Sequence, residues 1–382
     1  MRGQIAAAGW RSRLQSARGA VTDPGQAAPP RPPRWIGLAR LVALTAAAAI
    51  AVYLPFRLDP GDRTLYTLMG LYAIVAIGLS LLMGFAGQIS LGQGAFYAIG
   101  AYTAGILTVG LDPDERLVNP EAGIDPLLAL AIAPVLTAAV AAAIGVPLLR
   151  LRGHYLAFAT LALHLILIAL LFGFVRFTGG QDPGLVGVKP LEVGGWQFAD
   201  PDYRTKFAAI VWGVVFVTLL AAVNLVHSRA GRAFRAIATS ERAAAAAGVA
   251  VSSYKLRLFV LSAGLAGLAG GFYAFLLQFL SPDAFPVVLS IQFVVMVAVG
   301  GLGSVYGAVV GAVAVTWIAN ELRELGTRET LLGFDVPLHA PQVFSIGVFG
   351  LILIVVVLLF PSGLLPALAD GVRRFRRAAL NA

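Results

Sequence analysis

The stretch GFAGQISLGQGAFYAIGAYTAGI, from Gly84 to Ile106, is rich in glycine, carries no charge and contains two closely spaced glutamines. It lies inside an uncharged window that runs from residue 64 to residue 111. A membrane-spanning helix needs about 20 mostly apolar residues, so this window is too long for a single helix. We therefore expect two helices that meet at a glycine-rich break inside the quoted stretch.

The composition of the whole chain agrees with a membrane protein. The chain has 382 residues, of which 59% are hydrophobic and 12% are charged, whereas globular domains have about 25% charged residues. There is no cysteine, and the four histidines lie far apart in the sequence. A disulfide framework is therefore excluded, and we expect neither a metal site nor a cofactor.

A second long window, 284–320, divides at the sequence VGGLGSVYG (Val299–Gly307). The windows together predict an all-α fold: a polytopic helical membrane protein with about ten transmembrane segments and Gly-rich helix breaks. The expected spans are 36–57, 63–83, 91–110, 126–149, 154–176, 206–227, 256–281, 286–300, 304–321 and 340–360.

The basic residues indicate the orientation. With ten spans, most of the Lys and Arg fall on one side, which the positive-inside rule assigns to the cytoplasm together with both termini. The expected domains are a disordered basic cytoplasmic tail over 1–35, a transmembrane domain over 36–365 and a basic cytoplasmic tail over 366–382. The net charge of +9 then reflects flanks that face membrane lipid and gives no reason to expect nucleic-acid binding.

The spans exclude several function classes. No Asp, Glu or Lys lies deep in an expected span, which argues against a proton-coupled carrier but not against sodium sites built from backbone carbonyls. The chain has no G-x-x-x-x-G-K-[ST] motif, so any ATP that powers it is bound by another subunit. Neither a catalytic triad nor a metal cluster can be assembled, so we do not expect an enzyme. A passive channel and a sodium-coupled carrier stay as alternatives.

Two segments carry polar groups into the membrane. In the quoted stretch, Gln88, Ser90 and Gln93 either offer hydrogen bonds to a passing substrate beside unwound backbone, or belong to a tight turn with packing glycines. In LRLRGHYLAFATLALHLI, Leu149–Ile166, Thr160 and His164 are four residues apart and share one helix face. An intramembrane histidine indicates function, but a neutral histidine bonded to a neighbouring helix fits the sequence equally well.

The longest cytoplasmic loop, His227–Arg257, is strongly basic. We expect a helix over 232–247, with a second short helix that Ser240–Glu241 could start and Gly248 would end. This loop is either a docking site for a cytoplasmic motor or a basic surface on anionic lipid.

A further glycine motif, GGLGSVYGAVVGA, covers Gly300–Ala312. Glycines four residues apart form a bare stripe on a helix, where a second helix can approach closely. We favour helix packing over substrate contact for Gly303, Gly307 and Gly311.

Five motifs in order resemble the branched-chain amino acid ABC-transporter permeases of the LivM type. They are GFAGQISLGQGAFYAIGAY, LRLRGHYLAFATLAL, TGGQDPG, the segment SRAGRAFRAI to GGFYA, and VGGLGSVYGAVVGA. The terminal PSGLL fits as well, and the resemblance covers roughly residues 63–365.

The resemblance implies a multi-pass subunit of a bacterial inner membrane that imports branched-chain or other hydrophobic amino acids. It implies three kinds of partner: a second homologous permease, two cytoplasmic ABC ATPases that hydrolyse the ATP, and a periplasmic substrate-binding protein. Related permeases carry urea or short-chain amides, which is the alternative substrate class.

By the same resemblance, loop 227–257 is the coupling loop, in which Gly231, Arg232, Arg235, Glu241 and Gly248 match the family motif. The family usually has an acidic or amide residue near Thr239–Ser240, which this sequence lacks. The resemblance also favours a translocation-path role for the glycine-rich break. The expected path residues are Gln88, Ser90, Gly92, Gln93, Tyr97, Thr160 and His164.

Overall fold

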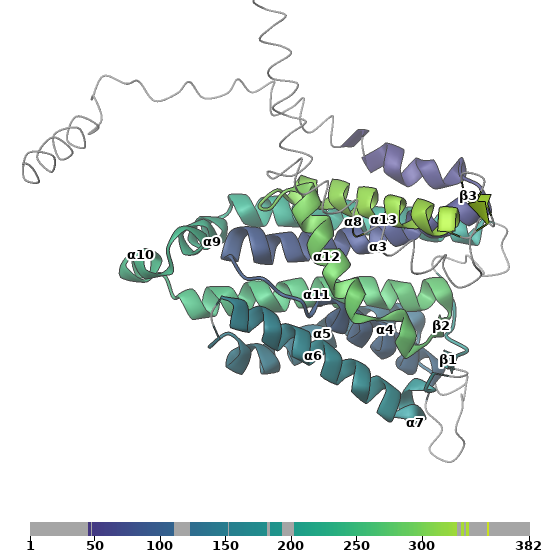
Figure 1. The fold of residues 1–382 in the computed structure, drawn as a ribbon, viewed down its shortest axis with the longest axis horizontal. Helices are drawn as coiled ribbons and strands as arrows, with labels where there is room; N and C mark the ends of the chain where they lie inside the picture. The colour runs from purple at the N-terminus through teal and green to yellow at the C-terminus, as the bar shows by residue number, and fades with distance from the viewer. Residues whose placement is uncertain are drawn as a thin grey trace, which may run out of the picture. The chain divides into compact units, whose positions relative to one another are not determined.

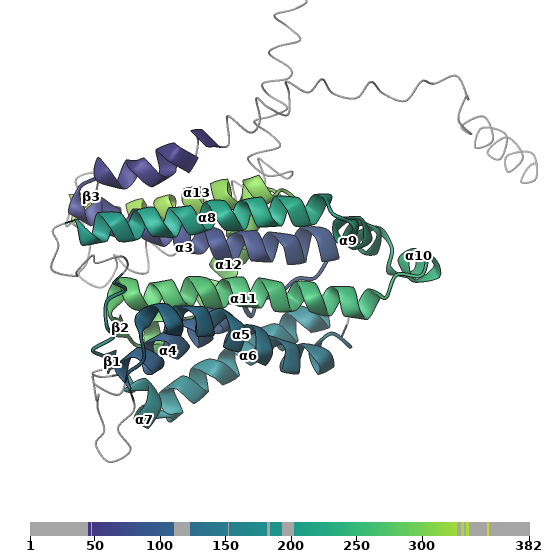
Figure 2. The same ribbon diagram turned by 180° about the vertical axis from the view of Figure 1, so that it is seen from behind.

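The computed structural model divides the chain into two units, residues 1–49 and residues 50–382, and the fold described below is that of the second. The two units are described separately because their relative placement is not defined. In the second unit most of the described residues are helical (Figures 1 and 2). The structure describes residues 45–46, 48–110, 123–151, 153–181, 184–192, 202–326, 330–331, 334–335 and 350.

The long window around the quoted stretch forms two helices, as the sequence predicts. Helix α3 spans Pro60–Ser80 and continues as a π-helical turn, η2, over Leu81–Phe85. Helix α4 spans Gln93–Val109, and residues 87–92 between them are not helical. The predicted helix break is therefore confirmed, and a π-helical turn precedes it.

The second long window also divides where the sequence predicts. Helix α12 spans Val287–Gly300 and α13 spans Val305–Gly326. Gly301 and Gly303 in the turn between them have φ angles of 109° and 81°, which residues with a side chain rarely adopt. The glycines of this motif therefore make the turn itself.

The other apolar windows form helices close to their expected bounds. Pro60 is the first residue of α3, and Pro126 is the first residue of the helix Pro126–Leu148. The Asp125 side chain caps the second of these helices by accepting a hydrogen bond from the Leu127 amide at 2.8 Å. The remaining helices are η1 Leu54–Phe56, α5 Pro126–Leu148, α6 His154–Gly173, α7 Val175–Thr178, α8 Tyr203–His227, α9 Arg229–Thr239, α10 Glu241–Ala246, α11 Val251–Leu277 and η3 Pro282–Ala284.

Two very short strand pairs interrupt the helical fold. Strand β1, Leu185–Val186, pairs antiparallel with β2, Phe279–Leu280. Strand β3, Thr330–Leu331, pairs in the same way with β4, Phe334–Asp335. The sequence does not predict them, because two-residue strands have no periodicity to detect.

Seven helices of the described part are long and apolar enough to cross a membrane. These seven helices indicate that the protein crosses the membrane several times. Residues 45–46 and 48–57 of the expected span 36–57 are described; 45–46 and 48–53 are helical, and Leu54–Phe56 form η1. Both expected tails, 1–35 and 366–382, lie outside the described residues, as does the expected span 340–360 apart from residue 350. The count of ten spans and the cytoplasmic termini therefore stay predictions.

Helix α11 runs through the middle of the unit, with α3, α8 and α13 on one side and α4, α5 and α6 on the other (Figures 1 and 2). It packs directly against α3, α4 and α5. Helices α3 and α4 are almost fully buried, whereas α5 and α6 expose one apolar face. The glycine-rich break therefore lies next to the centre of the helix bundle.

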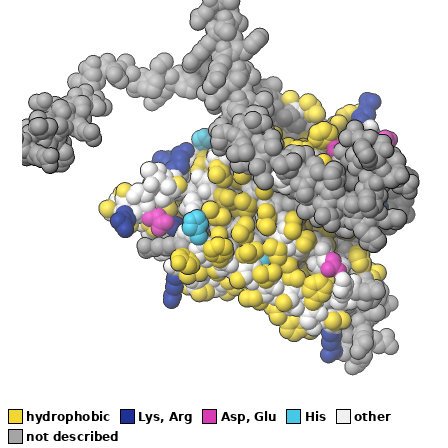
Figure 3. Space-filling view, in the orientation of Figure 1, with side chains coloured by type: hydrophobic (Ala, Val, Ile, Leu, Met, Phe, Trp, Pro, Cys, Tyr) yellow, Lys and Arg dark blue, Asp and Glu magenta, His cyan; other side chains and the backbone are white. Residues whose placement is uncertain are grey.

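The exposed surface is apolar in a way that suits lipid. Val135 on α5 is 68% exposed and Phe158 on α6 is 64% exposed, and Figure 3 shows hydrophobic side chains over most of the visible face. Basic side chains lie at both ends, at the end where α9 and α10 lie and at the end where β1 and β2 lie. We call these the α10 end and the β1–β2 end. A lipid bilayer would cover the apolar faces between them.

Candidate functional site

The break between α3 and α4 buries Gln88, Ser90 and Gly92 in the bundle and leaves Gly87 and Ile89 exposed. After η2, the Gln88 amide donates to the Leu82 carbonyl at 3.2 Å, and Gly87 turns the chain with a φ of 63°. The side chains of Gln88 and Ser90 are then 3% and 1% exposed. This segment is thus a piece of unwound backbone held among helices, which is tolerated at membrane depth only where protein or a cavity lines it.

The break packs against α6. The Leu91 amide donates to the Thr160 hydroxyl at 2.9 Å, and that hydroxyl donates to the Ala157 carbonyl at 2.9 Å. A Cβ atom at Gly92 would lie only 3.1 Å from the Thr160 carbonyl oxygen. Thr160 lies six residues after the start of α6, about 9 Å along the helix. The break therefore meets α6 inside the bundle and not at its end.

His164, one turn beyond Thr160, joins three further segments. Its Nε2 lies 3.1 Å from the Phe285 carbonyl oxygen, and its Nδ1 lies 2.8 Å from the Ser290 hydroxyl. The Gly94 amide donates to the same hydroxyl at 2.8 Å. A carbonyl can only accept, so Nε2 carries the proton and Nδ1 accepts from Ser290. His164 is therefore bonded to neighbouring segments through both ring nitrogens, as the second sequence interpretation expects.

Gln93 begins α4 and faces α11. Its side-chain amide donates from Nε2 to the Ser262 hydroxyl at 3.0 Å. The Oε1 atoms of Gln93 and Gln88 are both buried and accept no hydrogen bond from any residue that the structure describes. A buried polar atom without a partner costs about 1–3 kcal/mol. These two carbonyl oxygens are therefore acceptors that no described residue satisfies.

The predicted path residues therefore gather in one place. Gln88, Ser90, Gly92 and Gln93 belong to the break, and Thr160 and His164 contact it from α6. Tyr97 lies one turn further along α4 and is 1% exposed. Sequence reasoning missed Ser262, Ser290 and the Phe285 carbonyl, which complete the network. Single hydroxyls in apolar helices give no sign of which face they occupy.

One variant tests the histidine network. Ser290→Ala leaves the Gly94 amide and the His164 Nδ1 atom without partners, at a cost of about 1–3 kcal/mol. We expect the detergent-solubilised protein to melt several degrees lower than the wild type, with Ser253→Ala on the exposed part of α11 as control. Equal melting of the two variants would show that the network contributes no stability.

The glycine motif at α12–α13 differs from its predicted form. Gly307 and Gly311 do face α12: a Cβ at Gly307 would overlap the Gly300 carbonyl, and one at Gly311 would overlap the Met296 carbonyl. Gly303 does not share their helix, since α13 begins at Val305. The prediction of one helical stripe of three glycines is therefore wrong. Gly303 instead lies in the turn, where a Cβ at Gly84 would overlap its backbone.

The basic loop forms two short helices and not one. The predicted continuous helix over 232–247 breaks at Ser240, whose extended backbone caps α10 by accepting a hydrogen bond from the Ala243 amide. Gly248, with a φ of 82°, ends α10: its amide donates to the Ala245 carbonyl, and the Val249 amide donates to the Ala244 carbonyl. The alternative start at Ser240–Glu241 and the end at Gly248 are confirmed.

This loop presents arginines outward and is anchored inward. On α9, Phe234 and Ile237 are buried, while Arg232 and Arg235 are exposed. Gly231 allows α9 to turn sharply against α8, because a Cβ there would overlap the Val226 carbonyl.

Side-chain contacts hold the loop to α11. Glu241 forms an ion pair with Lys255, and Phe234 packs edge-on against Tyr254 with ring centroids 5.6 Å apart. Helix α9 also packs against η2, the π-helical turn that leads into the break. The basic helix α9 therefore contacts the turn that leads into the break.

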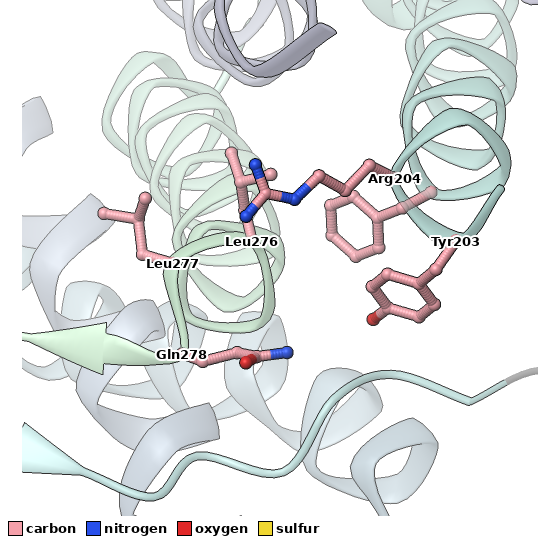
Figure 4. A pocket seen from close by; sticks show the side chains of 6 residues that line it. Tyr203, Arg204, Leu276, Leu277 and Gln278 are labelled. Atoms are coloured by element: carbon pink, nitrogen blue, oxygen red, sulfur yellow. The ribbon is translucent and has the colours of Figure 1, made fainter. Parts of the chain in front are cut away.

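A small pocket lies at the β1–β2 end, between the first turn of α8 and the last turn of α11 (Figure 4). Arg204 reaches across it towards Leu276, and Gln278 closes it with a φ of 57°. Tyr203 accepts a hydrogen bond from the Leu191 amide at 3.0 Å. This pocket has no contact with the break. The described residues hold no group of three His, Asp or Glu that could bind a metal ion.

Comparison with known proteins identifies relatives of the whole bundle. The family model described as branched-chain amino acid transport system / permease component matches residues 63–357. The high-affinity branched-chain amino acid transport system permease protein LivM of Salmonella typhimurium is 31% identical over 342 residues, which are 85% of this chain and 74% of that protein.

Two further relatives are more distant. LivH of the same organism is 26% identical, over 78% of this chain and 92% of its own length. The probable branched-chain amino acid transport permease protein LivM of Methanocaldococcus jannaschii is 25% identical, over 78% of this chain and 91% of its own length. No solved structure matches the chain significantly.

Proposed function

Since the chain belongs to the family of permease components of branched-chain amino acid transport systems, we propose that it is the membrane-spanning subunit of an ATP-driven importer. Its substrates are branched-chain or other hydrophobic amino acids, as the names of its relatives suggest. Those names favour amino acids over urea or short amides. The chain itself supplies the path, and separate subunits hydrolyse the ATP.

One observation carries this proposal. The unwound segment 87–92 buries Gln88, Ser90 and Gly92 in the bundle, and the basic helix α9 packs against the π-helical turn η2 that leads into it. Unwound backbone lined by protein is where transporters present polar groups to a substrate. A surface that can receive a cytoplasmic motor thus contacts the turn that leads directly into the segment that would bind the substrate.

The path residues have distinct roles in this proposal. The free Oε1 atoms of Gln88 and Gln93 accept hydrogen bonds from a substrate amine. Gly92 lets the break lie against α6, where the Thr160 hydroxyl accepts from the Leu91 amide. The Ser290 hydroxyl accepts from the Gly94 amide and is itself bonded to His164. Ser90 and Tyr97 complete the lining. Gly307 and Gly311 keep α12 and α13 in backbone contact, so that these helices move as one unit.

The proposed assembly needs three kinds of partner. A second homologous permease completes the membrane domain, two cytoplasmic ATPases dock on α9 and α10, and a periplasmic binding protein delivers the substrate. This places the chain in a bacterial inner membrane, with the α10 end in the cytoplasm. The exposed arginines of α9 suit an acidic surface on the ATPases.

The proposal is tested by reconstitution. The chain is placed in proteoliposomes with its partner permease, the two ATPases and the binding protein, and uptake of radiolabelled leucine is measured with and without ATP. We expect uptake only with ATP and only in the complete assembly. Leucine flux through the chain alone, without ATP, would instead show a passive channel, and dependence on a sodium gradient would show a secondary carrier.

The coupling role of α9 is tested by Arg232→Glu. Reversing this exposed charge weakens docking, so uptake should fall roughly tenfold while membrane insertion stays normal. The remaining ATP hydrolysis should no longer respond to the loaded binding protein.

The matched control is Arg150→Glu, which makes the same charge reversal at an exposed position in the turn after α5. Equal uptake by the two variants would remove the docking role from α9.

A further inference from the structure

Six aromatic rings meet beyond the break, and we call them the Tyr97 cluster. Tyr97 lies at its centre, with its ring centroid 5.3 Å from that of Tyr273 and 5.9 Å from those of Phe285 and Phe293. The six residues come from four helices and the segment after η3: Tyr72, Tyr97, Tyr102, Tyr273, Phe285 and Phe293.

The cluster lies between the break and the β1–β2 end. Tyr97 follows Gln93 by four residues on α4, so the two side chains share one helix face. Tyr273 lies one turn before the end of α11, which leads into β2. A solute that moves along α4 from the β1–β2 end towards Gln93 therefore meets these rings first. On this face of α4, none of the other predicted path residues lies between Tyr97 and Gln93.

Two hydroxyls in the cluster have no partner. The Oη atoms of Tyr97 and Tyr102 are buried and make no hydrogen bond with any residue in the described ranges. Their side chains are 1% and 3% exposed. Buried tyrosine hydroxyls are normally bonded, and a phenylalanine would fill the same space without the desolvation cost. Unpaired hydroxyls at this place point to a partner that binds in another state.

One side of the cluster is fixed and the other is held by the histidine network. Helices α4 and α11 touch backbone to backbone, because a Cβ at Gly270 would overlap the Tyr97 carbonyl and one at Gly100 would overlap Gly267. These helices cannot separate without losing that contact. Phe285, in contrast, has one hydrogen bond to α6 among the described residues. In that bond, His164 Nε2 donates to the Phe285 carbonyl oxygen.

The movable side is connected to the basic loop. Helix α9 packs against η2, and Gly84 of η2 lies against Gly303 in the turn that joins α12 to α13. Helix α12 carries Phe293 and follows Phe285 directly. A displacement of η2 therefore reaches the two phenylalanines through packed backbone.

We propose that the Tyr97 cluster is the closed gate of the translocation path, and that the Tyr97 and Tyr102 hydroxyls bind the polar head of the solute when Phe285 and Phe293 move away. The solute is small and amphipathic, since ring faces accept its apolar part and hydroxyls accept or donate to its charged or amide head. This inference rests on the proposed transport function.

The hydroxyl part is tested with Tyr97→Phe and Tyr102→Phe in the complete reconstituted assembly. Each keeps the ring and removes only the oxygen, so we expect unchanged or higher melting temperature and a roughly tenfold lower maximal leucine uptake. The control is Tyr155→Phe, which removes a hydroxyl from a side chain that is 74% exposed. Wild-type uptake by both cluster variants would overturn the binding role.

The gate part is tested with Tyr97→Ala in liposomes that hold the two permeases without ATPases. We expect radiolabelled leucine to leak out, while wild-type liposomes retain it. Retention by a folded Tyr97→Ala protein would overturn the gate, and if that variant does not fold, Phe285→Leu takes its place with the same two outcomes.

Wild-type uptake is measured first in the same preparations. Failure of ATP-driven uptake by the wild type would overturn the proposed function itself. Normal wild-type uptake with unaffected tyrosine variants would overturn only the binding role and the gate of the Tyr97 cluster.

Discussion

Gly92→Leu is expected to abolish ATP-driven uptake. A Cβ atom at this position would lie 3.1 Å from the Thr160 carbonyl oxygen and 3.3 Å from the Thr160 Cβ, so a leucine side chain has no space against α6. Overpacking costs roughly 1–3 kcal/mol, and at the upper end leucine uptake falls about 100-fold. The measurement is initial uptake rate in the complete assembly, normalised to the amount of inserted protein.

The control for this variant lies in the same break. Gly87 has a φ of 63° and open space around its Cβ position, and asparagine tolerates that conformation better than other residues. Gly87→Asn should therefore transport at close to the wild-type rate. If Gly92→Leu did the same, the break would be a passive turn and the proposed path would lie elsewhere.

Gly311→Leu is expected to prevent folding of the helix bundle. A Cβ here would overlap the Met296 carbonyl oxygen and lie 2.7 Å from the Gly300 amide nitrogen, and both atoms belong to backbone that cannot rotate away. Helices α12 and α13 would have to separate, at a cost that exceeds the roughly 3 kcal/mol of ordinary overpacking. We expect little or no monodisperse protein in size-exclusion chromatography after detergent extraction.

Gly213→Leu provides the comparison. Gly213 on α8 has no atom within 4 Å of its Cβ position, so the same substitution meets open space. This variant should elute and melt like the wild type. Matching behaviour of the two variants would mean that α12 and α13 do not depend on backbone contact.

The local elements of this protein follow closely from its sequence. The lengths of the two apolar windows and the positions of their glycines predict both breaks. An apolar window longer than the membrane must divide into two helices, and glycine adopts the non-helical backbone of the break at the least energetic cost. Ser240 and Gly248 mark the limits of α10 through capping bonds that depend only on neighbouring residues. The longer helix predicted over 232–247 was wrong because this serine cap outweighs the helix propensity of the alanines around it.

The partners of the polar side chains were not predictable in this way. Helices in a bilayer are apolar on all sides, since lipid and protein interior are equally apolar, so periodicity does not show which face is buried. Ser262 and Ser290 look like any other hydroxyl in an apolar helix, yet one bonds Gln93 and the other joins Gly94 to His164.

The sequence by itself thus determined the membrane class, the two helix breaks, the two-helix basic loop as an alternative, and the family. Only the tertiary structure decided that the break is buried against α6, that His164 is fully bonded, and that Tyr97 stands at the centre of an aromatic cluster. Backbone breaks and caps are local and leave a mark in the order of residues. Contacts between helices depend on how apolar surfaces rotate and pack, which nothing local in an all-apolar helix specifies.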